Sequence, residues 1–400
     1  MFKISRDKKE GLLCVANFRA NTGYAWDFIE SLFLGVAMRL KVKDIDTYVV
    51  YPEIKSVPCS FKGTSAKALE LEVNFGSVRS LIKLIKLIVS KNIRTVYLTD
   101  RAVFHPAYFI MRLFGIRHIV VHDHTSGAKT IPTGVKYWLK WLTRKLPGMQ
   151  ANIAIGVSDF VAKRLVDVSL VPKDRVRRIW NSVTLPQVDV NTRKKISENF
   201  GLPEDTFIIL CACRSTKEKG VEKLLYAFDK MCKELDCRVG LAKPFLIYMG
   251  NGPIFDQLVK IKGELASRDK ILFAGYRPDA AQLTGGADLC VVPSLWEEAF
   301  CLAALEPMAQ GVPVIASQVG GIPEVVVNGE TGIIVEPGDV NELCKAMLEI
   351  YNNPIKKRNM GEKGRQIAME KFSREDKLDD LSLLIGLGYN SFQQNNIIER

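Results

Sequence analysis

Residues 287–317 read ADLCVVPSLWEEAFCLAALEPMAQGVPVIAS, in which two short apolar runs flank a longer apolar segment. We expect the first run to be a strand that ends at Pro293, because proline cannot donate to a strand ladder. Gly311 and Pro313 end the longer segment, which we predict as a helix over residues 299–310. A strand, a helix and a strand in this order predict a parallel sheet covered by helices.

The same alternation of strand-like and helical patterns continues through both halves of the chain. Four hundred residues suit about two domains, and the polar, breaker-rich segment 186–205 separates two alternating blocks. We therefore predict an α/β protein with two doubly wound, Rossmann-like domains that face each other across a cleft. The predicted parts are an N-terminal domain over 1–185, a C-terminal domain over 186–375, and a helical tail over 376–400 that packs back on the N-terminal domain.

Composition excludes several classes of protein. Hydrophobic residues make up 47% and charged residues 25% of the chain, as in globular proteins, and no uncharged apolar run reaches the roughly 18 residues of a membrane span. The first residues lack the pattern of a signal peptide. The nine scattered cysteines form neither zinc-type pairs nor a disulfide framework, which predicts a reducing, cytoplasmic location.

Positive charge is concentrated in the first half of the chain. Residues 1–190 carry 30 lysines and arginines against 15 acids, whereas residues 191–400 carry 26 against 29. The first half is thus +15 and the second −3. Such asymmetry predicts an anionic partner for the first half: a phospholipid surface, a phosphorylated substrate or nucleic acid.

Two acids stand out in the predicted helix. If residues 299–310 are helical, Glu298 and Glu306 lie about 12 Å apart and within roughly 80° of one face. That separation exceeds the roughly 5 to 9.5 Å between the carboxylates of a glycoside hydrolase. It suits a long ligand held at both ends, with phosphates at the helix N-terminus. A nucleotide diphosphate sugar has this layout, although a solvated helix position is the alternative for Glu306.

A resemblance to a known family adds to this interpretation. Residues 293–337 (PSLWEEAFCLAALEPMAQGVPVIASQVGGIPEVVVNGETGIIVEP) and 214–228 (RSTKEKGVEKLLYAF), with GNGP, ILFAGY and ADLCVVPS in family order, resemble the retaining glycosyltransferases of family four, "glycosyl transferases group 1". These have the GT-B fold and a motif of two glutamates separated by seven residues. The likeness covers almost all of the second half.

The resemblance implies roles for individual residues. Arg214 and Lys219 match the cations that bind the donor diphosphate and stabilise its departure, a task suited to charge-assisted hydrogen bonds. Glu298, which alone among the adjacent acids has the right spacing, matches the acid at the transferred sugar, and Glu306 matches the acid at the ribose. The backbone of three residues would receive phosphate oxygens: Phe300, Cys301 and Leu302. Cys301 departs from the family, which usually has glycine there.

The first half resembles the family less closely. Gly23, in the turn after the first strand, stands where the family has a glycine pair near the donor phosphates, although a plain turn is the alternative. His124, at the end of the strand-like run HIVVHD, matches the family's catalytic histidine. His122 and Asp123 could instead belong to a metal site, and Asp44 with Asp46 spells the DxD of the other glycosyltransferase fold. We favour neither and expect no metal and no prosthetic group.

Residues 131–148 (IPTGVKYWLKWLTRKLPG) predict an amphipathic helix. Val135, Trp138, Leu139, Leu142 and Leu146 form one apolar face, which we expect to pack inward. The opposite face, expected to point outward, suits a membrane interface or an acceptor, because aromatic rings settle at headgroup depth and cations meet anionic lipid. Its members are Tyr137, Lys140, Trp141 and Arg144. A core helix is the alternative.

The sequence therefore predicts a retaining glycosyltransferase. It would move a sugar from a UDP- or GDP-sugar to a glycan or lipid-linked acceptor, in cell-surface polysaccharide or glycolipid biosynthesis, at the cytoplasmic face of an anionic membrane. A soluble small-molecule acceptor is the alternative. A basic nucleic-acid-binding protein and a pyridoxal-phosphate-dependent phosphorylase are less favoured, because neither has a recognisable motif here.

Overall fold

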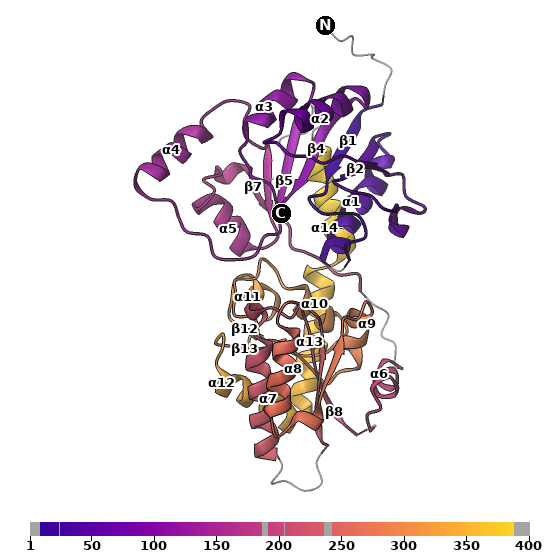
Figure 1. The fold of residues 1–400 in the computed structure, drawn as a ribbon, viewed down its shortest axis with the longest axis vertical. Helices are drawn as coiled ribbons and strands as arrows, with labels where there is room; N and C mark the ends of the chain where they lie inside the picture. The colour runs from indigo at the N-terminus through magenta and orange to yellow at the C-terminus, as the bar shows by residue number, and fades with distance from the viewer. Residues whose placement is uncertain (1–8, 24, 186–190, 204, 236–241, 388–400) are drawn as a thin grey trace. The chain divides into compact units, whose positions relative to one another are not determined.

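The computed structural model describes residues 9–23, 25–185, 191–203, 205–235 and 242–387, which form two compact units. As far as it is described, the first unit consists of the chain up to Thr125, Lys129–Trp180 and the chain from Glu375 onward; the second consists of Ser126–Ala128 and Asn181–Arg374. Each unit is built around one parallel sheet with helices on both faces (Figure 1).

The first sheet has seven strands in the order β3-β2-β1-β4-β5-β6-β7. The order turns back between β1 and β4, and ligands of doubly wound sheets usually bind at the carboxyl edge beside such a reversal. The strands are β1 (Gly11–Val15), β2 (Asp46–Tyr51), β3 (Lys67–Glu70), β4 (Ile93–Thr99), β5 (His118–Asp123), β6 (Ile153–Gly156) and β7 (Val176–Arg178). The helices are α1 (Ala25–Lys41), α2 (Val78–Ser90), α3 (Pro106–Leu113), α4 (Gly134–Arg144), α5 (Asp159–Asp167) and α14 (Arg374–Gly386).

Helix α14 belongs to the core of the first unit, although it is the last of the described helices in sequence. Its buried residues Leu378, Leu381 and Ile385 join the cluster that α1 and one face of the sheet form. Arg39 of α1 forms ion pairs with Glu375 and Asp379 at the rim of this contact. The other face of the sheet is covered by α2, α3 and α5.

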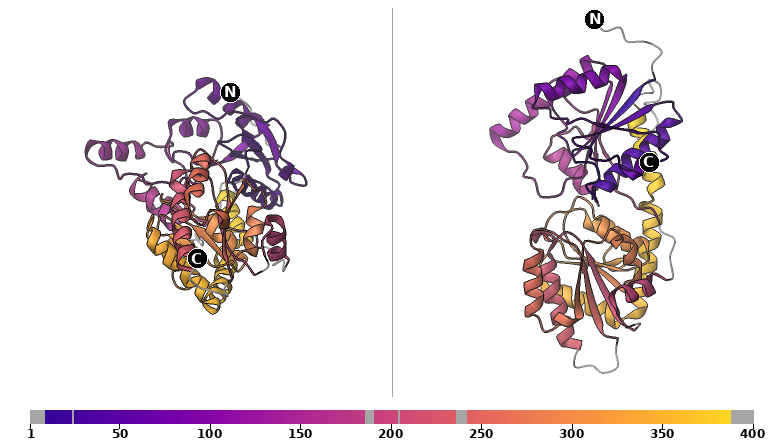
Figure 2. Two further views of the ribbon diagram at one scale, coloured as in Figure 1. Left: turned by 60° about the horizontal axis from the view of Figure 1, so that its bottom comes forward. Right: turned by 45° about the vertical axis from the view of Figure 1, so that its right-hand side comes forward.

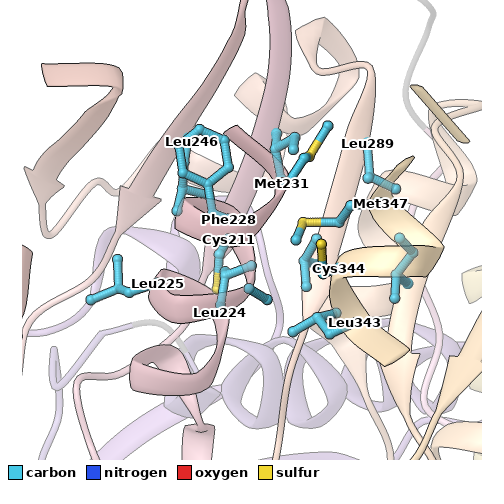
Figure 3. Packing of buried hydrophobic residues seen from close by; sticks show 14 of the residues in the cluster. Cys211, Leu224, Leu225, Phe228, Met231, Leu246, Leu289, Leu343, Cys344 and Met347 are labelled. Atoms are coloured by element: carbon cyan, nitrogen blue, oxygen red, sulfur yellow. The ribbon is translucent and has the colours of Figure 1, made fainter. Parts of the chain in front are cut away.

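The second sheet has six strands in the order β10-β9-β8-β11-β12-β13, with its reversal between β8 and β11. Leucine, phenylalanine and methionine side chains of α7 and α12 fill the core on one face (Figure 3). The strands are β8 (Phe207–Ala212), β9 (Pro244–Met249), β10 (Ile271–Gly275), β11 (Leu289–Val292), β12 (Val314–Ser317) and β13 (Gly332–Val335). The helices are α6 (Thr192–Phe200), α7 (Val221–Leu235), α8 (Phe255–Glu264), α9 (Ala280–Leu283), α10 (Leu302–Ala309), α11 (Ile322–Val325), α12 (Val340–Asn352) and α13 (Pro354–Lys371).

The predicted doubly wound α/β fold is confirmed, with one strand that the sequence did not predict. Strand β3 reads KALE, is partly exposed and pairs only with β2 at the edge of its sheet, so it carries no apolar run. Residues 186–190 and 204 of the expected hinge lie outside the described part of the chain, and the remainder contains α6. Every helix in the described ranges is too short or too polar to cross a bilayer.

Substituting Leu381 tests the packing of α14 in the first unit. Leu381 is fully buried, whereas Leu383 on the same helix is 43% exposed. We expect Leu381→Ala to lower the free energy of unfolding by about 2 to 5 kcal/mol, because it leaves a cavity. Leu383→Ala should change it by less than about 0.5 kcal/mol. Urea denaturation of both variants provides the measurement, and equal effects would contradict the packing.

Candidate active site

Two loops of the second unit meet where its strand order reverses. Residues 213–220 follow β8 and residues 293–301 follow β11, and these two strands are neighbours. The backbone amide of Leu295 donates to the carbonyl oxygen of Glu218 at 2.7 Å, which ties the two loops together. Since ligands of doubly wound sheets bind at this edge, these loops form the candidate site.

An ion pair between Lys219 and Glu298 lies at the centre of the two loops. Lys219 Nζ is 2.5 Å from Glu298 Oε1, and the hydroxyl of Ser294 donates to the same oxygen at 2.7 Å. The Glu298 side chain is buried. Burial alone would lower the pKa of Lys219, but the Glu298 carboxylate raises it, so the net pKa lies above its usual value. Lys219 is therefore a cation at neutral pH.

Two glycines let the backbones approach closely around this pair. Gly220 has φ +65°, and a Cβ there would lie 2.0 Å from the carbonyl oxygen of Pro293. Gly320 has φ +54°, and its Cβ would lie 2.2 Å from the carbonyl oxygen of Glu298. That oxygen accepts from the amide of Gly321 at 2.8 Å. A side chain at either glycine would push the Glu298 loop away.

Arg214 is placed by side chains that the sequence did not single out. Tyr248 of β9 donates its hydroxyl to the carbonyl oxygen of Cys213 at 3.0 Å and lies 2.7 Å from the Ser215 hydroxyl. These bonds hold the residues on both sides of Arg214, whose own side chain is exposed. Tyr248 acts on a loop more than thirty residues away in sequence, so no local pattern indicated it.

Helix α10 begins later than predicted. It spans Leu302–Ala309 with Cys301 as its N-cap, not residues 299–310. Glu298 lies in a loop whose backbone bonds to Gly321, so the helical rise of about 12 Å between Glu298 and Glu306 does not apply. Cys301 makes no side-chain cap bond at this helix start, and the first amides of a helix favour anions.

Cys301 fits its position without the family's glycine. Its φ is −129°, an extended value that any residue adopts, so the backbone there does not require glycine. The side chain is buried. Burial, followed by the nearby Glu298 carboxylate, raises the pKa of the thiol to about 12, which keeps it neutral. Phe300 is also buried and packs edge-on against Phe372, with ring centroids 5.7 Å apart.

Glu306 is a carboxyl group in an apolar setting. It lies in α10 among buried neighbours such as Leu305 and Met308. Burial raises its pKa to about 7, because the charged form loses hydration there. A ligand hydroxyl that donates to the carboxylate would recover part of that loss. The second predicted acid is thus poised to ionise when a polar ligand arrives.

His124 lies in the first unit, directly after β5. Its backbone amide donates to Asp100 Oδ1 at 2.7 Å. Its ring lies against that of His122, with centroids 4.1 Å apart, and His122 Nδ1 is 2.7 Å from the Tyr97 hydroxyl. Burial lowers the pKa of both histidines, so both rings are neutral at pH 7. Among the described residues, His124 Nε2 has no hydrogen-bond partner.

A buried ion pair holds the segment that carries His124. Arg164 of α5 donates to Asp123 Oδ2 at 3.2 Å and to the carbonyl oxygen of Thr125 at 2.6 Å. Asp123 in turn accepts from the amide of Thr125 at 2.9 Å. Both carboxylate oxygens of Asp123 therefore accept hydrogen bonds from the protein. Within the described ranges, no group of three or more metal-ligating side chains comes together.

Gly23 occupies a turn between β1 and α1. Its φ is +90°, a value that favours glycine, and its carbonyl oxygen accepts from the amide of Trp26 at 3.2 Å. The positive φ of this turn is enough to explain why the residue is glycine, without a role in phosphate binding.

Helix α4 is oriented in the opposite sense to the one predicted. Lys140 Nζ donates to the carbonyl oxygen of Val168 at 2.5 Å, and Arg144 Nε donates to that of Ser169 at 2.9 Å. The expected outward cations thus point back into their own unit. The expected inward face, which includes Trp138 and Leu142, is exposed. Of the predicted outward residues, Tyr137 is half-buried and Trp141 is exposed.

Part of the chain is similar in sequence to a known family and to curated proteins. Residues 192–367 match the family described as glycosyl transferases group 1. The chain is 29% identical over 226 residues to N-acetyl-alpha-D-glucosaminyl L-malate synthase of Bacillus anthracis, covering 56% of this chain and 57% of that relative. It is 26% identical over 298 residues to a GDP-mannose-dependent alpha-(1-6)-phosphatidylinositol monomannoside mannosyltransferase of Mycolicibacterium smegmatis, covering 71% and 74%. The first of these alignments spans less than two thirds of the relative.

The fold is shared with a solved glycosyltransferase of Rickettsia africae, which superposes with a TM-score of 0.79 at 20% identity and covers 96% of this chain and 99% of that chain. A structure of Anabaena HepE in complex with UDP superposes with a TM-score of 0.74 at 18% identity, covering 95% of this chain and 100% of that chain. This similarity confirms the predicted GT-B fold.

Glu306→Gln tests the buried carboxyl. The folded protein keeps the Glu306 proton up to about pH 7, whereas the unfolded chain loses it near pH 4.5. Between these values, rising pH favours unfolding of the native protein but not of the variant. We expect the stability of Glu306→Gln relative to the native protein to grow by about 3 kcal/mol at most and to level off above pH 7. Urea denaturation across pH gives the measurement; a difference independent of pH would contradict the burial.

Two glycine substitutions test the contact between the loops. Gly201 and Gly220 have the same backbone conformation, but only Gly220 meets another backbone. We expect Gly201→Ala to cost about 1 kcal/mol of stability, from left-handed strain alone. Gly220→Ala should cost at least about 3 kcal/mol, because its Cβ overlaps Pro293. Thermal denaturation compares them, and similar losses would argue against the close approach.

Proposed function

Because residues 192–367 belong to the glycosyl transferases group 1 family, we propose that this protein transfers a sugar from a nucleotide diphosphate sugar, a UDP- or GDP-sugar, to a glycan or lipid-linked acceptor with retention of anomeric configuration. The observation that carries the proposal is the Lys219–Glu298 ion pair, held at the strand reversal beside the N-terminus of α10. A cation, a carboxylate and free helix amides are the groups that a diphosphate and a sugar need.

Each charged group has a part in this proposal. Lys219 and the exposed Arg214 bind the diphosphate and stabilise the charge that develops on it as the sugar departs. The first amides of α10 receive further phosphate oxygens. Lys219 and Ser294 both donate to Oε1 of the Glu298 carboxylate, and Oε2 is proposed to accept from the sugar hydroxyls.

Glu306 accepts from the ribose hydroxyls in this proposal. Its pKa of about 7 means that the empty protein holds it half protonated at neutral pH. Ribose hydroxyls that donate to the carboxylate favour the ionised form, so donor binding releases a proton. The proposal thus links nucleotide affinity to pH through one residue.

Retention is proposed to arise from reaction on one face of the sugar. The departing phosphate oxygen takes the proton of the acceptor hydroxyl, so the protein supplies position and charge and no dedicated base. His124, whose buried Nε2 atom has no hydrogen-bond partner among the described residues, contacts the transferred sugar in this proposal. No metal takes part in this scheme.

The acceptor proposal rests on the names of two relatives. One is a mannosyltransferase acting on a phosphatidylinositol monomannoside, which favours a lipid-linked acceptor and a cytoplasmic, peripheral position at the membrane. The other is named for L-malate, which favours the soluble acceptor as a second candidate. Transfer from a radiolabelled donor to membrane extract or to malate distinguishes the two, and NMR of the product anomer tests retention.

Substitutions on the loop after β8 test donor binding. We expect Arg214→Ala to weaken the binding of the best UDP- or GDP-sugar at least tenfold, about 1.4 kcal/mol, because it removes a charge-assisted hydrogen bond. Lys217→Ala, an exposed lysine on the same loop, is the matched control and should bind as the native protein does. Isothermal titration calorimetry measures both.

Lys219→Ala should abolish binding, but it also leaves Glu298 buried without its partner, so its stability must be measured alongside. The double variant Lys219→Met/Glu298→Gln removes both charges and separates the two effects. Full binding by Arg214→Ala together with the double variant would overturn the diphosphate assignment.

A further inference from the structure

Helix α4 presents an apolar face that none of the described residues of its own unit covers. Val135 is 75% exposed, Trp138 62%, Leu139 60% and Leu142 59%. Their spacing of three and four residues places them on one side of the helix. Leu146, just beyond the helix, continues the same side and is also exposed. We call these five residues the α4 apolar face; in the views of Figures 1 and 2 the helix stands apart from the sheet of its unit.

The polar side of α4 holds the helix in this orientation. The bonds from Lys140 to Val168 and from Arg144 to Ser169 satisfy carbonyl oxygens at the end of α5. The Arg144 guanidinium also lies over the ring of Phe104, 4.9 Å from its centroid. The side chains of Lys140 and Arg144 therefore bond within their own unit. None of the residues of α4 is buried. A helix in water normally shows the reverse arrangement.

Positive charge is concentrated in the part of the chain that carries this face. Residues 129–178 contain eleven lysines and arginines and three acids, a net charge of +8. Lys136, Lys145, Lys163 and Lys173 are exposed. Lys145 Nζ lies 4.8 Å from the ring centroid of Trp141, so a cation and an indole stand together beside the apolar face. Such pairs suit the boundary between lipid tails and anionic headgroups.

Two partners could cover the α4 apolar face, a second copy of the chain or a lipid bilayer, and the net charge favours the bilayer. A second copy of the chain would bring another +8 against the first, which opposes self-association through this face. A bilayer with anionic lipid offers apolar tails for the face and negative charge for its surroundings. The helix has 11 residues and is about 16 Å long, roughly half the thickness of a hydrocarbon core, so it fits parallel to the surface and not across it.

We propose that the α4 apolar face inserts into the headgroup boundary of an anionic lipid bilayer, with the surrounding lysines on the lipid phosphates. This inference deepens the proposed function and rests on it for its purpose, because a lipid-linked acceptor would lie in the same bilayer. Binding to lipid needs neither donor nor turnover, however, so the two proposals can fail separately.

The test is flotation of the full-length protein with vesicles of phosphatidylcholine alone and with added phosphatidylglycerol. We expect binding to the anionic vesicles only, weakened by salt. Trp138→Ser/Leu142→Ser should reduce binding at least about tenfold, because it removes apolar area from the inserted face. The matched control, Val42→Ser/Val78→Ser, changes two residues that are 91% and 75% exposed elsewhere in the same unit and should leave binding unchanged. All four positions are exposed, so the variants should fold.

A second measurement reports the depth of insertion. Vesicles with brominated acyl chains should quench tryptophan fluorescence of the native protein and quench Trp138→Ser less. Donor binding by calorimetry should be the same for the native protein and Trp138→Ser/Leu142→Ser. Failure to bind anionic vesicles, or equal binding by both double variants, would overturn the proposal. A dimer in solution that Trp138→Ser/Leu142→Ser converts to a monomer, without vesicle binding, would instead identify the face as a self-interface.

Discussion

The ion pair between Lys219 and Glu298 is the interaction on which the candidate site depends. The two residues are 79 positions apart and meet only because β8 and β11 are neighbours in a parallel sheet. A buried charge without a partner is costly, so each residue holds the loop of the other in place. The glycines at 220 and 320 permit the close approach that the pair requires. Charge is therefore positioned before any ligand arrives, which is the arrangement that lowers the cost of reorganisation during catalysis.

Much of this site could be predicted from the residues, but its geometry could not. The spacing of Glu298 and Glu306 and the cations at 214 and 219 indicated a ligand with phosphates. The assumption that the helix begins at residue 299 was wrong, because hydrogen bonds to Gly321 compete with helix formation near Glu298. Such competition depends on a loop more than twenty residues away. Tyr248 was not predicted for a similar reason. Its hydroxyl bonds to Cys213 and Ser215, which follow the neighbouring strand, whereas the apolar residues beside it in sequence are typical of a core strand.

For helix α4, the sequence predicted the helix but not which of its faces points inward. Hydrophobic periodicity predicted the helix and its two faces correctly, since Gly134–Arg144 is helical. Periodicity cannot decide which face points inward when neither face has enough neighbours to bury it. Carbonyl oxygens at Val168 and Ser169 decide it, because they need donors that Lys140 and Arg144 supply. Strand β3 was missed because an exposed edge strand needs no apolar run.

Helix α14 has a consequence for the order in which the protein folds during synthesis. The second unit is nearly continuous in sequence, so almost all of it leaves the ribosome together. The first unit is not: the apolar side of α1 stays uncovered until residues 375–386 are made, after the whole second unit. The strands synthesised first thus belong to the unit completed last, and in the meantime Gly35 and Leu40 of α1 lack the neighbours that α14 brings. Nascent chains of this protein should need protection by chaperones mainly along that one helix.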